Sequence, residues 1–146
     1  MSIVGIVQLP RGATGFRHVD SPPLATVDLR AFKAWGHSVG HVLDFHPAGP
    51  TPNFHLLTLR LPSGDLSVVC HASLPLIAFA PVPFDGSFLS RPDLAPSFFG
   101  FDTLTAEALA TPLARADLSL LDEAEHRQIR HWRPATVGEL LFNHWD

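Results

Sequence analysis

Two apolar stretches, residues 54–61 and 66–72, flank the turn-forming segment Pro62-Ser63-Gly64-Asp65. This pattern predicts a β-hairpin with a four-residue loop. In that register one face is apolar throughout, because it carries the pairs Leu61 with Leu66, Leu59 with Val68, and Leu57 with Cys70. The opposite face is half polar and carries the pairs Arg60 with Ser67, Thr58 with Val69, and Leu56 with His71. We therefore expect an antiparallel sheet that is covered mainly on one side.

Further elements are predicted in the first half of the chain. Three other segments are rich in β-forming residues and indicate strands: residues 3–9, 42–45 and 76–80. Asp28 can cap a short helix that carries Leu29 and Phe32 and ends near Gly36.

The second half of the chain is predicted to be helical. Thr105 can cap a short helix that runs through Leu109. Ser119, with Asp122 three positions later, indicates the start of a longer helix that ends before Pro134. Its inward-facing residues are expected to be Leu121, Ala124, Ile129 and Trp132.

The last helix has the clearest start. Thr136 and Glu139 form a capping box, in which each side chain accepts a hydrogen bond from the backbone N–H of the other residue. We expect this helix to run to Asp146 and to be docked by an apolar stripe formed by Val137, Leu140, Leu141 and Trp145. An arginine of the preceding helix is expected to bind the carboxylates of Asp146, and the candidates are Arg127, Arg130 and Arg133.

These elements predict an α+β fold, in which an antiparallel sheet of three to five strands is packed by C-terminal helices. The length of 146 residues fits a single globular domain over residues 1–146.

Composition narrows the function classes. The net charge is −4 and Lys33 is the only lysine, so no basic surface for nucleic acid is expected. Cys70 is the only cysteine and has no partner for an internal disulfide. Residues 1–10 lack the basic start of a signal peptide, and no apolar stretch is long enough to span a membrane. We therefore expect a cytoplasmic protein.

Residues 81–102 have no regular period, although they carry five phenylalanines: Phe84, Phe88, Phe98, Phe99 and Phe101. Irregular connections of this length are uncommon in compact domains and often form binding loops. The rings either fasten the loop to the core, which is the commoner role of buried aromatic residues, or line a pocket or an interface.

Histidines are the only candidates for chemistry. His37 and His41 have the i, i+4 spacing of two metal ligands on a helix, but Gly36 and Gly40 weaken that helix. No glutamate follows His37, as the metalloprotease motif requires, so we expect no metal.

Two other arrangements of histidines are present in the sequence. Glu123 and His126 form a single E-x-x-H step, whereas a di-iron bundle needs two, so a solvated helix face that includes Glu125 is the simpler interpretation. His46, His55 and His71 come from separate segments. Their side chains could meet at one site if the polar face of the sheet formed the bottom of a pocket.

No nucleotide-binding or nucleophile motif is present, because the chain lacks G-x-G-x-x-G, a P-loop and G-x-S-x-G. Cys70 lies on the apolar face of the hairpin and is expected to be inert. We therefore expect no cofactor.

The leading hypothesis is a non-catalytic binding or protein-interaction module, whose partner is another protein or a small apolar ligand. Its expected contact residues are Phe84, Phe88, Phe98, Phe99, Phe101 and Trp145. One alternative is a small metal- or histidine-dependent hydrolase that uses His37 and His41 with His71 or Glu123. Another is a homodimer that buries Trp132 and Trp145 at its two-fold axis.

Overall fold

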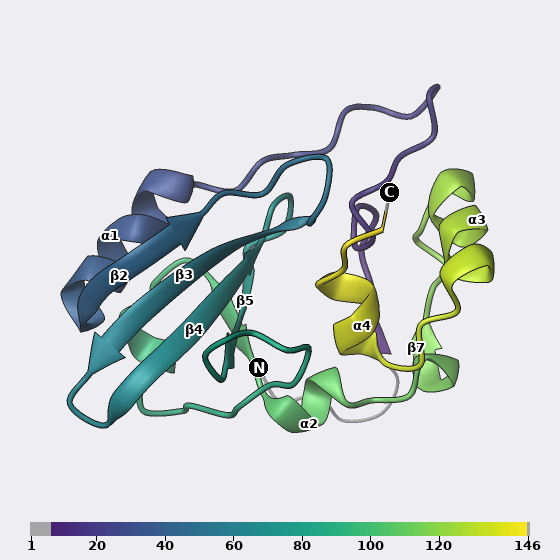
Figure 1. Cartoon of the computed structure of the whole chain (residues 1–146). Coiled ribbons are helices and arrows are strands. Elements are labelled where there is room, and N and C mark those ends of the chain that lie inside the picture. Colours follow the sequence, from purple (N-terminus) through teal and green to yellow (C-terminus); the bar gives the residue numbers. More distant parts are fainter. Residues whose placement is uncertain (1–6, 146) are drawn as a thin grey trace.

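A five-stranded sheet lies at the centre of the computed structural model, which describes residues 7–145 (Figure 1). Its order is β2 (His41–His46), β3 (Phe54–Leu61), β4 (Gly64–His71), β5 (Leu76–Ala80) and β6 (Asp102–Leu104). Strands β2 to β5 are antiparallel to their neighbours, whereas β6 pairs with β5 in parallel. The α+β class is confirmed. The prediction of a purely antiparallel sheet is wrong at the edge formed by β6. The long connection after β5 returns the chain to the end of the sheet where β5 begins.

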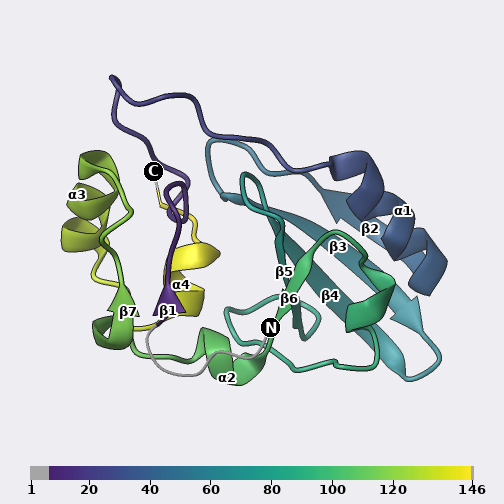
Figure 2. The ribbon, with the colours of Figure 1, turned by 180° about the vertical axis from the view of Figure 1, so that it is seen from behind.

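Helices and short strands flank this sheet. They are β1 (Val7–Gln8), α1 (Leu29–Val39), η1 (Ala95–Ser97), α2 (Ala106–Leu109), η2 (Leu113–Arg115), β7 (Ala116–Asp117), α3 (Glu123–Trp132) and α4 (Val137–Leu141). Strands β1 and β7 form a separate parallel pair. Helix α1 packs on one face of the main sheet, and α4 lies between the sheet and α3 (Figures 1 and 2). Within residues 7–145, none of the helices combines the length and the apolar composition needed to cross a bilayer.

The predicted first strand lies partly outside the described residues. Of residues 3–9, the structure assigns only Val7–Gln8 to a strand, and residues 3–6 are not described.

The sheet separates two apolar cores, one on each face. The α1 side holds Phe32, Leu57, Leu59, Leu61, Leu66, Val68, Cys70, Ile77, Phe79 and Phe98. The α4 side holds Leu9, Ala13, Phe54, Val69, Ala78, Leu104, Leu109, Leu121, Val137, Leu140, Leu141, Phe142 and Trp145. The expectation that the sheet is covered mainly on one face is therefore wrong. Segments from both ends of the described chain meet on the second face and cover it.

The β3–β4 hairpin has the predicted apolar face in a different register. Leu59 pairs with Leu66 and Leu57 with Val68, so each pairing is shifted by two residues from the prediction. The loop contains only Pro62-Ser63, and Gly64 opens β4 with a φ of +123°, a conformation that residues with a Cβ rarely adopt. A shift of two residues preserves the face of each side chain, which is why the apolar pattern still holds.

Helix α1 begins where the sequence predicts. Asp28 is its N-cap, and its side chain accepts a hydrogen bond from the backbone N–H of Ala31 at 3.0 Å. The helix continues past the expected end at Gly36 to Val39. Gly36 is buried against β3, where a Cβ would overlap the side chain of Leu57, so this glycine permits close packing and does not end the helix.

Helix α4 begins as predicted but ends at Leu141 instead of continuing to Asp146. The Thr136/Glu139 capping box is present, and the chain leaves helical geometry at Phe142 (φ −122°, ψ 84°). The expected apolar stripe is buried, and Trp145 is only 9% exposed, which confirms a docked tail. The expected ion pair of Asp146 lies outside the described residues.

Helix α3 is capped by Asp122, not by Ser119 as predicted. The side chain of Asp122 accepts from the backbone N–H of Glu125 at 3.1 Å, and the Glu125 carboxylate accepts from the N–H of Asp122 at 3.3 Å. Trp132 does not face inward as expected, because it is 40% exposed and stacks on Trp145 from outside.

The two faces of the β3–β4 hairpin predict different losses of stability for substitutions at adjacent positions. Leu57→Ala should reduce the free energy of unfolding by about 2–5 kcal/mol, because it removes a buried side chain beneath α1 and leaves a cavity. Thr58→Ala, at a half-buried position on the other face, should cost much less. Urea unfolding of both variants measures the difference, and equal losses would contradict the assigned faces.

Candidate functional site

A buried carboxylate holds the N-terminal turn against α3. Glu125 is 0% exposed, and its carboxylate accepts hydrogen bonds from Gly12 N (2.9 Å), Thr14 N (3.0 Å) and Thr14 Oγ1 (2.7 Å). Gly12 has a φ of +97°, and the tight turn at this position lets the backbone N–H groups of Gly12 and Thr14 point toward the same carboxylate, while the Ala13 N–H donates to the carbonyl of Pro10. The prediction that Glu125 belongs to a solvated face is therefore wrong, because its partners come from a segment distant in the sequence.

His71 belongs to the same scaffold. Its Nδ1 accepts from the backbone N–H groups of Ser73 (3.0 Å) and Leu74 (3.1 Å), so Nε2 carries the proton and donates to the carbonyl of Ala13 at 2.8 Å. Burial lowers the pKa of His71 to about 4. Both ring nitrogens are thus occupied and the ring is neutral at pH 7, so it is not available as a metal ligand or a general base.

Two asparagines fasten the C-terminal segment to the position that directly precedes β3. The backbone N–H of Asn53 donates to the carbonyl of Asn143 at 3.1 Å, and the N–H of Asn143 donates to Asn53 Oδ1 at 2.9 Å. The side-chain amide of Asn53 donates to Leu141 O, and that of Asn143 donates to Leu140 O. These contacts satisfy the carbonyls at the end of α4 and fix its position beside the sheet.

Beside this scaffold, α2, α4 and the β5–β6 edge enclose an apolar pocket of about 260 Å³. Its lining residues are Gln8, Leu9, Pro10, Leu74, Pro75, Leu76, Asp102, Leu104, Ala108, Leu109, Val137 and Leu141. The walls are almost entirely aliphatic, and Gln8 and Asp102 are the two lining residues with polar side chains.

The pocket walls are formed by side chains on one face of β5 and β6 and by the close contact between α2 and α4. Leu104 shares a face of β6 with Asp102, and Leu76 pairs with Asp102 on the neighbouring strand. Thr105 caps α2 as predicted, accepting from Ala108 N at 3.1 Å, and this places Leu109 toward α4. Gly138 lies so close to α2 that a Cβ would come within 3.1 Å of the Leu109 carbonyl, so the absent side chain allows the two helices to approach.

The five predicted loop phenylalanines do not gather at one place. Phe84 and Phe88 pack on the α4 side, where Phe84 contacts Phe54 at a centroid distance of 5.4 Å. Phe98 and Phe101 pack on the α1 side around Phe32. The ring of Phe99 is 80% exposed. The sheet therefore separates the rings, and they do not enclose a common pocket.

Trp145, the sixth predicted contact residue, stacks on Trp132 with parallel rings at 6.2 Å. None of the six residues lines the apolar pocket. Their contact with a ligand or partner stays a prediction, whereas packing accounts for the positions of all except the exposed Phe99.

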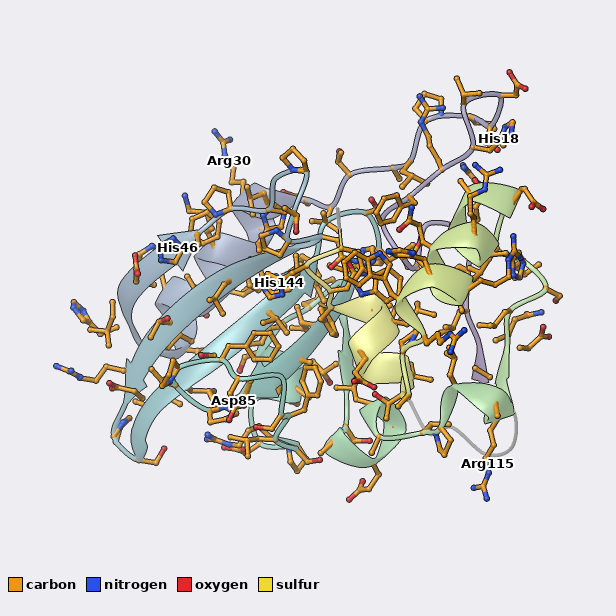
Figure 3. All side chains as sticks on the ribbon, turned by 45° about the vertical axis from the view of Figure 1, so that its right-hand side comes forward. His18, Arg30, His46, Asp85, Arg115 and His144 are labelled. Carbon is orange, nitrogen blue, oxygen red and sulfur yellow. The ribbon has the colours of Figure 1, made fainter. Side chains whose placement is uncertain are left out.

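The histidine candidates are also dispersed. His37 lies on α1 and His41 on β2, and both are exposed. His55 pairs with Cys70 on the α1 face, whereas His71 pairs with Phe54 on the α4 face, so these rings do not converge. His46 lies on the edge strand β2, well apart from His18, which lies on the other side of the molecule (Figure 3). Within residues 7–145, no group of three or more His, Cys, Asp or Glu side chains is arranged to hold a metal ion.

The thiol of Cys70 is buried in the α1-side core, and its burial raises its pKa to about 12. The thiol is neutral at physiological pH and is not a nucleophile. The prediction of an inert core cysteine is therefore confirmed.

Sequence reasoning missed both Glu125 and the pocket. Asp122-x-x-Glu125 has the same capping-box pattern that located α4, so the start of α3 could have been found from the sequence. The pocket has no such local signal, because Leu76, Leu104 and Val137 come from separate segments. The apolar stripe of α4 was the only sequence feature that indicated a buried surface here, because such a stripe has to pack against another segment.

In comparisons with known proteins, no protein-family model, no curated protein and no solved structure matches this chain. Any functional conclusion must therefore be argued from the site itself.

Glu125→Gln tests the role of the buried carboxylate. The variant places an amide NH₂ against backbone N–H donors, so at least one buried donor loses its acceptor, and the free energy of unfolding should fall by about 2–4 kcal/mol. Glu123→Gln, at an exposed position of the same helix, is the matched control and should have little effect. Similar urea midpoints for the two variants would contradict the assigned role.

The lowered pKa of His71 predicts that the protein loses stability in mild acid. Its folded pKa of about 4 lies below the unfolded value of about 6.5, so the unfolded chain binds the proton first. The free energy of unfolding should therefore fall by about 3 kcal/mol as the pH is lowered from 7 to 4. His55, whose pKa is also lowered by burial, adds a loss in the same direction.

Urea unfolding at several pH values, with His55→Gln to remove the second contribution, measures this loss. NMR of the imidazole ring should show His71 unprotonated on Nδ1 down to about pH 5. A His71 ring that titrates near pH 6.5 would contradict the buried neutral form.

Proposed function

We propose that this chain is a single-domain, non-catalytic binding module that holds a small apolar ligand in the pocket between α2, α4 and the β5–β6 edge. The observation that supports this most directly is the pocket's composition, because aliphatic walls with only a few polar groups are typical of small-molecule sites. Its position on a hydrogen-bonded scaffold supports a preformed site.

The inert state of the reactive side chains supports a non-catalytic role. The thiol of Cys70 is neutral, and both nitrogens of His71 are bound to backbone groups. The alternative hydrolase has less support, because its candidate ligands His37 and His41 lie on different elements and are exposed.

The pocket volume limits the size of the ligand. An apolar cavity of roughly 150 Å³ holds benzene, so a volume of about 260 Å³ corresponds to about ten non-hydrogen atoms. A concave space of this size favours a small ligand over a protein partner, which would need a wider surface.

The cellular location and the oligomeric state belong to the same proposal. A buried free thiol with no disulfide suits the cytoplasm. If a homodimer forms through the tryptophan pair, Trp132 provides the contact, because it covers the buried Trp145 and is itself half exposed.

Hexan-1-ol, a small amphiphile with seven non-hydrogen atoms, tests the pocket. It should bind the full chain and raise its thermal midpoint, because a ligand that binds only the folded state stabilises that state. Ala108→Phe should remove binding, since Ala108 lines the pocket and a phenyl ring would fill it. Ala114→Phe, at an exposed position outside the pocket, is the matched control.

The measurements are ligand-observed NMR and thermal unfolding. Equal binding of hexan-1-ol to the wild type, Ala108→Phe and Ala114→Phe would contradict the pocket as the binding site, and an absence of binding to the wild type would contradict the proposed function.

A further inference from the structure

Among the described residues, the only charged side chain that lines the apolar pocket is negative. The lining includes one carboxylate, Asp102, and no Lys, Arg or His among the described residues. Strand alternation places Asp102 on the same face of β6 as Leu104, which forms part of the pocket wall. The carboxylate therefore belongs to the pocket side of the sheet.

Asp102 has no partner for its charge within residues 7–145. Its backbone N–H donates to the carbonyl of Pro75 at 2.8 Å, but its side chain takes part in no hydrogen bond or ion pair with another described residue. Arg115, which directly precedes β7, points away from the body of the protein (Figure 3). The carboxylate at the pocket is thus available to a cation.

Gln8 adds a second acceptor at the same pocket. Its Nε2 donates to Asp117 Oδ2 at 3.1 Å, and a carboxylate can only accept, so the NH₂ end of the amide must face Asp117. The carbonyl oxygen of Gln8 is the end left for another partner. Both polar side chains of the lining therefore offer oxygen acceptors.

We propose that the pocket binds small amines: an apolar body of up to about ten non-hydrogen atoms lies between the aliphatic walls, and its ammonium group binds Asp102 and the Gln8 carbonyl. This inference rests on the proposed function and adds the chemical class of the ligand. An ammonium group donates to both acceptors, whereas a carboxylate ligand would be repelled by Asp102.

Three probes of the same chain length separate the apolar contribution from the charge: hexylamine, hexan-1-ol and hexanoate. At pH 7 the amine is protonated, as a lysine side chain is, and the acid is ionised. Titrations of the full chain at low ionic strength, about 10 mM, keep the charge contribution measurable. The amine should bind about threefold more tightly than the alcohol, and about tenfold more tightly than the acid.

Asp102→Asn should bring the amine-to-acid affinity ratio close to one, because the variant removes the charge that distinguishes the two ligands. Glu107→Gln is the matched control, because it removes the same charge from an exposed position on α2 that does not line this pocket. The control should keep the wild-type ratio. Raising the salt concentration should lower the ratio in the wild type but not in Asp102→Asn.

The failures of the two proposals are distinguishable. Binding of hexan-1-ol with no preference for the amine, or a preference that survives Asp102→Asn, would overturn the amine inference and leave the apolar pocket intact. Amine binding that survives Ala108→Phe would place the cation outside the pocket and would also overturn the inference. No binding of any probe would overturn the proposed function itself.

Discussion

Thr14 is the point at which the N-terminal turn, the sheet and the C-terminal helices are joined. Its backbone N–H and hydroxyl donate to the carboxylate of Glu125, and its carbonyl accepts from the side-chain amides of Asn53 and Asn143. One residue thus connects α3, the chain directly before β3 at Asn53, and the segment after α4. Because these groups are buried, loss of one bond leaves its partner without water to replace it, and the network holds the elements in one arrangement.

The pocket depends on this arrangement. Its walls come from β1 and the two residues after it, β5, β6, α2 and α4, and α4 contains too few residues to be stable alone. The asparagine bonds at its C-terminal end and the capping box at its start hold it in place. These buried polar bonds therefore fix one wall of the aliphatic pocket.

The same network occupies two side chains that could otherwise take part in acid–base chemistry. His71 and Glu125 would be candidates for acid–base chemistry by residue type, but the backbone occupies both. By contrast, the carboxylate of Asp102 lies at the pocket without a partner among the described residues. Asp102 thus differs from the two buried groups, because no described residue occupies its side chain.

Features with short-range causes were determined by the sequence alone. Asp28 starts α1, Thr136 and Glu139 start α4, and the alternation in β3 defines its apolar face, since each signal acts within a few residues. The α+β class follows from such elements.

Only the tertiary structure decided the features with distant partners. Helix α4 ends at Leu141 because Asn143 bonds to Asn53, which is 90 positions away, and Glu125 is buried because its donor Gly12 lies 113 positions away. The parallel direction of β6 and the walls of the pocket likewise depend on how separate segments meet. Local patterns specify where an element starts and which face is apolar, but the contacts that cover that face belong to the folded chain.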